Sequence, residues 1–169
     1  IWTPEGSPLI VISRRVVEQL RPRVDVPVEL AMRYQSPSIV SAMRKLVAQG
    51  INELFVIPLF PHYAMSSYET AVVRVKEVAS RLAPGLRIEV QPPYYDQPDY
   101  IAGLVASAAP HLEKGFDHLL FSFHGLPERQ IRKSDPTGCH CLAKVDCCQV
   151  PSPAHATCYR AQCIATTAA

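Results

Sequence analysis

The sequence predicts an α/β fold with a parallel sheet, because segments with helical spacing alternate with short apolar segments along the chain. Apolar runs at 53–60, 86–90 and 117–121 have the length and composition of strands, and the first is apolar almost throughout. Of the 169 residues, 48% are hydrophobic and 19% are charged, which is typical of a globular protein. The chain is long enough for one domain or for parts of two.

The first part of the chain predicts a helix over 9–19, a strand over 26–34 and then a second helix. The second helix has clear boundaries, with Ser36 as its N-cap, Pro37 at the first helical position and Gly50 just past its end. Its apolar residues recur at helical spacing and define the face expected to be buried: Ile39, Met43, Leu46 and Val47.

The strand at 53–60 is expected to be buried on both faces and to end at Pro58, which lacks a backbone donor. Residues 59–63 then form a loop beyond the carboxyl end of the strand, and Ser66 or Ser67 caps the next helix. The buried face of that helix is expected to comprise Ala71, Val72, Val75, Ala79 and Leu82.

The remaining elements are a strand at 86–90, a helix at 99–112 and a strand at 117–121. A proline-rich stretch at 91–98 is the best candidate for a domain boundary. The last strand leads into His124, so this imidazole is expected at the carboxyl end of a buried strand, where ligands bind in open α/β sheets. From these residues alone, a structural histidine and a ligand-binding one are equally good interpretations.

The residues around His124 read Ser-Phe-His-Gly-Leu-Pro over 122–127. This pattern resembles the metal-site motif of the ferrochelatases, which insert ferrous iron into porphyrins to make haem. Three further blocks resemble the same family: Gly-Ser-Pro-Leu at 6–9, Met-Arg-Tyr-Gln-Ser-Pro-Ser-Ile at 32–39, and Pro-Leu-Phe-Pro-His-Tyr-Ala-Met-Ser-Ser at 58–67. The blocks occur in the family's order, so the resemblance extends over almost the whole chain.

The resemblance implies a chelatase-like, three-layer α/β/α architecture with a parallel, Rossmann-like sheet and two similar domains. Residues 1–95 would be most of the first domain without its first strand, and 96–169 would be the start of the second. The chain begins with Ile1 rather than Met, so we interpret it as a fragment of the family's middle portion. The acidic residue that works opposite the histidine in this family would lie outside it, and we expect the fragment to be inactive alone.

The resemblance also implies a substrate site, because Ser7, Arg33, Tyr34, Phe60 and His124 match family positions that face the porphyrin. A porphyrin is a flat apolar disc with carboxylates on one edge, so its site needs aromatic faces and a cation. Arg33 would pair with a propionate through its planar guanidinium, while Tyr34 and Phe60 would supply ring faces. His124 would be the catalytic residue, either as a ligand of the incoming Fe²⁺ or as the acceptor of a pyrrole proton.

Several of these residues also have a purely structural interpretation. Ser7 would cap the helix that begins near Pro8, Arg33 would form a surface salt bridge, and Phe60 would belong to the core. Phe60 also departs from the tyrosine that is more usual in the family, so it keeps an aromatic face and lacks the hydroxyl.

All six cysteines lie between residues 139 and 163. Without a recognisable secretion signal, such crowding favours metal binding over disulfide bonds, and thiolates suit either zinc or an iron–sulfur cluster. The spacing does not separate these two, and ordinary or disulfide-bonded cysteines are a third alternative. The segment resembles the Cys-rich insert, here 139–163, that holds a [2Fe-2S] cluster in some bacterial ferrochelatases. That resemblance implies Cys141, Cys148, Cys158 and Cys163 as ligands, with Cys147 as the expected substitute and Cys139 as the expected bystander.

The composition excludes some partners. A formal net charge of +2, without a basic cluster interleaved with aromatic residues, argues against nucleic acid. No apolar run approaches the roughly 18 residues of a membrane-spanning helix, which favours a cytoplasmic protein and leaves peripheral membrane contact open. The oligomeric state is not predicted.

The intact protein is therefore expected to insert Fe²⁺ into protoporphyrin IX or coproporphyrin III, with porphyrin and ferrous iron as its partners. Two alternatives stay open: a cobalt or sirohaem chelatase of the same architecture, and a non-catalytic remnant that binds porphyrin or an iron–sulfur cluster. The Met-Arg-Tyr and Pro-Leu-Phe-Pro blocks argue against the first alternative.

Overall fold

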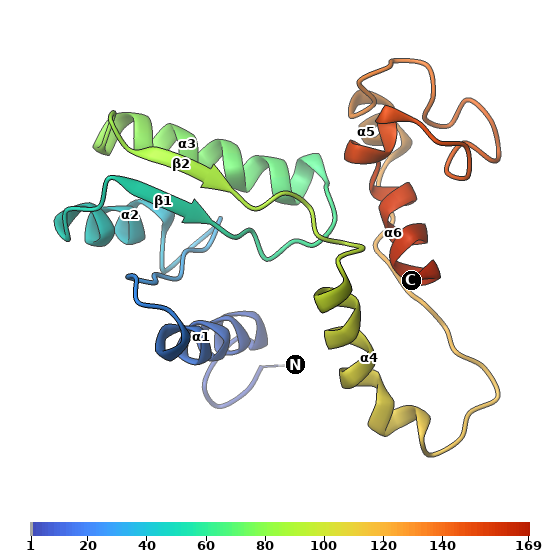
Figure 1. Ribbon diagram of the computed structural model, residues 1–169, viewed down its shortest axis with the longest axis horizontal. Coiled ribbons are helices and arrows are strands. Elements are labelled where there is room, and N and C mark those ends of the chain that lie inside the picture. Colours follow the sequence, from blue (N-terminus) through green and yellow to red (C-terminus); the bar gives the residue numbers. More distant parts are fainter. Residues whose placement is uncertain (1) are drawn as a thin grey trace. The chain divides into compact units, whose positions relative to one another are not determined.

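The computed structural model describes residues 2–169, and these form two compact units. The first unit comprises the chain up to Val56 together with Ala71–Glu89, and the second comprises Ile57–Thr70 together with Val90–Ala169. Helices alternate with strands in the first unit, which confirms the predicted α/β class (Figure 1). Within residues 2–169, no helix has both the length and the apolar character needed to cross a membrane.

The elements follow the chain in a simple order. The first unit contains α1 (Pro8–Leu20), a 3₁₀ turn (Arg21–Arg23), α2 (Ile39–Ala48), β1 (Glu53–Val56), α3 (Thr70–Leu82) and β2 (Arg87–Val90). The second contains a π-helical turn (Met65–Glu69), α4 (Pro98–Leu112), α5 (Glu128–Lys133), a 3₁₀ turn (Pro153–Thr157) and α6 (Tyr159–Ala168).

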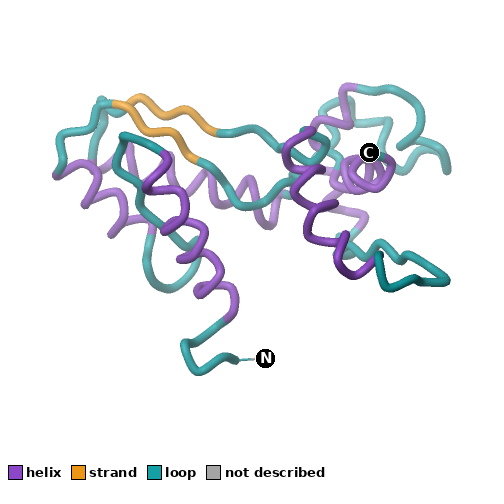
Figure 2. The backbone as a smooth tube through the Cα atoms, turned by 60° about the horizontal axis from the view of Figure 1, so that its bottom comes forward, coloured by secondary structure: helices purple, strands orange, loops and turns teal. Residues whose placement is uncertain are grey.

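The sheet of the first unit consists of β1 and β2, which lie side by side in Figure 2 and point the same way in Figure 1. The crossover between them includes α3, as parallel strands require. The pairing begins where the N–H of Arg87 donates to the carbonyl of Asn52 at 3.0 Å. The side chains of Arg87 and Glu53 also form an ion pair at this end of the sheet.

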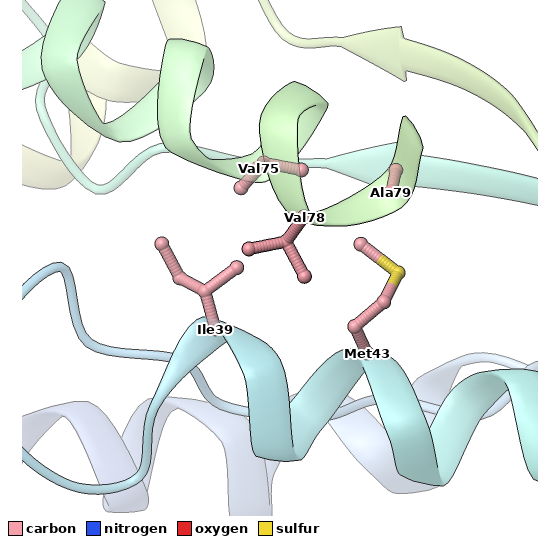
Figure 3. Packing of buried hydrophobic residues seen from close by; sticks show 5 residues of the cluster. All are labelled: Ile39, Met43, Val75, Val78 and Ala79. Atoms are coloured by element: carbon pink, nitrogen blue, oxygen red, sulfur yellow. The ribbon is translucent and has the colours of Figure 1, made fainter. Parts of the chain in front are cut away.

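The core of the first unit lies between α2 and α3. Ile39 and Met43 point from α2 toward Val75, Val78 and Ala79 of α3 (Figure 3). Met43 is 3% exposed and Val78 is 4% exposed, so these side chains are fully packed. The helical spacing predicted all of these positions except Val78, which lies three residues after Val75 and therefore on the same side of α3.

One face of the sheet is covered and the other is open. Leu54 and Val56 of β1 pack against the helical core, whereas Phe55 is 51% exposed. The prediction that this strand is buried on both faces is therefore wrong for the described residues. The strand also ends at Val56, earlier than the predicted range 53–60, and the chain continues as a loop.

The start of α2 differs from the prediction by two residues. Ser38, rather than Ser36, is the N-cap, and its Oγ accepts the N–H of Ser41 at 3.1 Å. The carbonyl of Pro37 instead accepts the N–H of Met32 at 2.7 Å, so it belongs to the preceding loop. The cap forms at the first serine whose hydroxyl can reach the free N–H groups of the helix.

The predicted glycine end of α2 is confirmed, and the predicted serine cap of α3 is wrong. Gly50 adopts φ +77° and donates its N–H to the carbonyl of Val47 at 2.9 Å, which confirms the predicted end of α2. Neither Ser66 nor Ser67 caps α3, because both lie inside the π-helical turn that precedes it. Ala64 occupies the N-cap position of that turn and supplies no side-chain cap.

Two predicted strands, 26–34 and 117–121, are loops in the structure. The first makes a single bridge, between Met32 and Ser38, and the second makes none. A strand forms only where another strand accepts its hydrogen bonds, and within residues 2–169 neither segment has such a neighbour. Apolar side chains of the second segment are consequently exposed, with Leu120 at 87%.

Candidate functional site

Arg33 and Tyr34 lie together on the loop that precedes α2 in the first unit. The bond from the Met32 N–H to the Pro37 carbonyl closes this loop, and Gln35 at φ +63° provides its sharp turn. The guanidinium carbon of Arg33 lies 4.6 Å from the centre of the Tyr34 ring, which is a cation–π contact. The structure thus joins two of the predicted porphyrin-binding residues.

A cavity of about 260 Å³ adjoins this loop. Two arginines, Arg33 and Arg74, line it together with apolar residues. This combination suits a ligand with a carboxylate on an apolar body. Arg74, which also pairs with Glu77 at 3.0 Å, was not predicted, because a single arginine on a helix resembles an ordinary solvated residue. The lining comprises Met32, Arg33, Tyr34, Gln35, Ser38, Ile39, Val40 and Arg74.

Ser7 occupies the N-cap position of α1, immediately after Gly6 in the left-handed region at φ +119°. The carbonyl of Ser7 accepts the N–H of Val11 at 3.1 Å, but its hydroxyl makes no capping hydrogen bond. The alternative in which this hydroxyl serves only as a cap is therefore not realised here.

Residues 60–63, called the 60–63 loop below, carry Phe60 in the second unit, where this ring is 37% exposed. Backbone hydrogen bonds hold the loop at two points. The Pro61 carbonyl accepts the N–H of Tyr94 at 2.9 Å, and the Tyr63 N–H donates to Oε1 of Gln162 at 2.6 Å. Burial, reinforced by the charge of nearby Glu69, raises the pKa of Tyr63 to about 12, so its hydroxyl stays protonated.

His62 is the buried histidine of the same loop, at 9% exposure. Its Nε2 lies 2.8 Å from the hydroxyl of Thr166, and its ring packs edge-on against Phe123 at 5.6 Å and Tyr159 at 5.7 Å. Burial lowers the pKa of His62 below its usual value, which favours the neutral ring. No sequence pattern distinguishes this residue from its neighbours.

His124 is exposed and lies on a loop, so its predicted place at the end of a buried strand is wrong for the described residues. The ring of the neighbouring Phe123 packs against that of His62. An exposed imidazole can accept a proton or reach a metal ion.

Cys158 is 2% exposed and precedes α6, and it shares a buried cluster with Cys141, against which Cys148 packs. Burial is the main cause that raises the pKa of both Cys141 and Cys148 to about 12. The neighbouring Cys158 is the second cause for each. Cys163, which lies within α6, is also buried. Cys147 contacts Cys148, with 4.0 Å between the two sulfur atoms.

Cys139 differs from the other cysteines, which are buried or half-buried. It is exposed, and its thiol contacts the hydroxyl of Thr137 at 3.8 Å. All six thiols are free, so the disulfide alternative is not realised. Buried thiols are the donors that iron–sulfur clusters and zinc require, so the chemistry fits. In the described part of the chain, however, no three metal-binding side chains converge on one point.

Polar side chains brace the segments that carry these cysteines. The Asp135 carboxylate accepts the N–H groups of Thr137, His140 and Cys141, each at 2.8 Å. These bonds, that of Cys141 first, hold the pKa of Asp135 well below its usual range. The rings of His140 and His155 both contact the carbonyl of Cys147, at 2.7 and 3.0 Å. No motif in the sequence marks these braces.

Comparison with known proteins agrees with the four sequence blocks. The family model for ferrochelatase matches residues 1–169. A curated ferrochelatase from Stutzerimonas stutzeri (strain A1501) is 54% identical over 168 residues, which are 98% of this chain and 49% of the relative. Another, from Opitutus terrae, is 52% identical over 171 residues, 100% of this chain and 50% of the relative. A third, from Azotobacter vinelandii, is 47% identical over 166 residues, 97% of this chain and 49% of the relative. The chain spans about half the length of these curated relatives, and it belongs to the ferrochelatase family.

Proposed function

We propose that the intact protein inserts Fe²⁺ into a porphyrin to form haem. The observation that carries this proposal is the family match over the whole chain, at about half identity to relatives named ferrochelatase. The cavity that contains Arg33 and Arg74 supports it, because two cations beside apolar side chains suit a porphyrin carboxylate. The substrate is a porphyrin with two or four carboxylates.

The reaction replaces two pyrrole N–H protons with one Fe²⁺, so a base must accept protons and the hydrated iron must lose water. We assign to the exposed imidazole of His124 either the acceptance of the pyrrole protons or the transfer of iron to the porphyrin. A neutral imidazole can accept a proton or bind iron. Arg33 pairs with a propionate, Tyr34 and Phe60 present ring faces, and Ser7 offers a hydroxyl that no cap uses.

We further propose a [2Fe-2S] cluster on Cys141, Cys148, Cys158 and Cys163. The buried cluster of Cys141 and Cys158, the packing of Cys148 against it, the burial of Cys163 and the exposure of Cys139 support this ligand set. When bound, such a cluster supplies a one-electron redox centre. Its binding would require the thiols to lose their protons and to move closer together. The six free thiols also support a cytoplasmic location, where the glutathione pool keeps cysteines reduced.

The activity is tested with the full-length protein under anaerobic conditions, with Fe²⁺ or Co²⁺ and each candidate porphyrin. Loss of porphyrin fluorescence follows insertion, and we expect the fastest loss with Fe²⁺ and protoporphyrin or coproporphyrin. Faster insertion of Co²⁺ into a sirohaem precursor would favour the related chelatase. Porphyrin binding without any insertion would support a non-catalytic remnant and contradict the proposal.

The cluster is tested on the same anaerobically purified protein by its visible absorption and by iron and acid-labile sulfide assays. We expect charge-transfer bands and iron and sulfide in equal amounts. Cys158→Ser should abolish the bands, whereas Cys139→Ser, the matched control, should retain them. A colourless folded protein that contains zinc would rule out the iron–sulfur cluster.

A further inference from the structure

One face of α6 contacts the predicted substrate-site segments of the second unit. Tyr159, Gln162 and Thr166 lie on this face, because residues three and seven positions apart share one side of a helix. The ring of Tyr159 packs on that of His62, with 5.7 Å between the ring centres. The other two residues hold the 60–63 loop.

Gln162 is fully buried at 0% exposure, and all its polar atoms are engaged. Its Oε1 accepts the Tyr63 N–H at 2.6 Å, while its Nε2 donates to the carbonyls of His155 at 3.1 Å and Ala156 at 2.9 Å. One side chain therefore connects the 60–63 loop to the turn that precedes Cys158. A buried amide with three partners has one allowed orientation, so it fixes the backbone that it contacts.

Thr166 fixes the side chain of His62 in the same loop. Its hydroxyl lies 2.7 Å from the carbonyl of Tyr95, 3.1 Å from that of Gln162 and 2.8 Å from Nε2 of His62. A hydroxyl has one hydrogen and carbonyls only accept, so Thr166 donates to a carbonyl and accepts from His62. The proton of the neutral His62 ring is therefore on Nε2, and the ring orientation is set by α6.

One cysteine precedes the same helix and another lies within it. Cys158 precedes its first turn, the N–H of Gln162 donates to the Cys158 carbonyl at 3.1 Å, and Cys163 follows Gln162 directly. Anything that holds these two sulfurs in place also holds the side chains that bind the loop. The substrate-site loop and the Cys-rich segment thus share one helix as their support.

We propose that Gln162 and Thr166 are positioning residues, which fix the 60–63 loop, and with it Phe60, for porphyrin binding. Neither residue needs to touch the substrate, because each acts through Tyr63 or His62. The inference rests on the proposed function and adds to it the part of the chain that sets the shape of the substrate loop.

The experiment compares Thr166→Val with Thr167→Val in the full-length protein. Thr167 is a matched control, because it is exposed and its hydroxyl contacts only the Cys163 carbonyl, at 3.0 Å. Amide hydrogen exchange over 59–65 and porphyrin affinity, from fluorescence quenching, are measured for both. We expect Thr166→Val to speed exchange and weaken porphyrin binding by about tenfold each, with kcat within about twofold of wild type. Thr166→Ser, which restores the hydroxyl, should recover both values.

Unchanged exchange and unchanged porphyrin affinity in Thr166→Val would overturn the inference, as would equal effects in Thr167→Val. If Thr166→Val does not fold, Gln162→Leu replaces it, since that change removes the bond that holds the N–H of Tyr63. It should speed exchange over 59–65 by about tenfold, and no change there would count against the inference. A wild-type protein that binds no porphyrin would instead contradict the proposed function, and the exchange data would distinguish the two failures.

Discussion

Replacement of Gln162 by leucine measures how strongly α6 holds the segments around it. Gln162→Leu keeps the approximate volume and the burial but removes three hydrogen bonds. At about 1 kcal/mol each, and more where a buried partner stays unpaired, the loss is about 3–4 kcal/mol. Burial of the added apolar surface returns about 1–1.5 kcal/mol, so the net destabilisation should be about 2 kcal/mol.

The assay is urea unfolding of the full-length protein, followed by far-ultraviolet circular dichroism. Gln149→Leu is the matched control, because Gln149 is exposed, and it should change the free energy of unfolding by less than about 0.5 kcal/mol. A destabilisation by Gln162→Leu no larger than that of the control would refute the reasoning. It would show that the three bonds of Gln162 are readily replaced by water.

Three further changes test other parts of the structure. Arg33→Ala should weaken porphyrin affinity by about tenfold to hundredfold, because it removes a charge-assisted bond to a propionate. The control Arg14→Ala, on the exposed side of α1, should leave the affinity unchanged. Equal affinities of the two variants would make Arg33 structural. Because burial lowers the pKa of His62 from its usual 6.5, the stability from its neutral form is complete above pH 6.5 and is lost as the pH falls below that value. Urea titrations at about pH 7.5 and pH 5 should therefore show a smaller loss of stability in His62→Gln than in wild type, and parallel losses would contradict this. Val78 is 4% exposed, so Val78→Ala should lower the free energy of unfolding by about 2 kcal/mol. Val73 on the same helix is 47% exposed, so Val73→Ala should lower it by less than about 0.5 kcal/mol. Equal values would place the core elsewhere.

The features that sequence reasoning found were those with local causes. Helical spacing located the apolar face of α2, and Gly50 marked its end, since both depend on residues within a few positions. The predictions of strands at 26–34 and 117–121 were wrong, because a strand depends on a partner from elsewhere in the chain. The apolar composition of 117–121 was recognised correctly, but composition does not supply the neighbour.

In the candidate site, too, features that depend on nearby residues were predicted, and features that depend on distant ones were missed. The crowding of the cysteines is visible in the sequence, and in the structure Cys141 and Cys158 share a buried cluster, while the predicted ligand set stays a prediction. Arg74, Asp135 and Gln162 were missed, because each acts through geometry or backbone hydrogen bonds that leave no spacing pattern. His62 was undervalued for a related reason, since its partner Thr166 lies 104 positions further along the chain.

The most direct test of the account is iron insertion by the full-length protein compared with its His124→Ala variant, with porphyrin affinity measured on both. We predict that wild type forms haem from Fe²⁺ and porphyrin, and that His124→Ala binds porphyrin within about threefold of wild type but loses insertion by at least about a hundredfold. Unchanged turnover in the variant would remove His124 from the mechanism. A wild-type protein that binds porphyrin and inserts no iron would contradict the central claim.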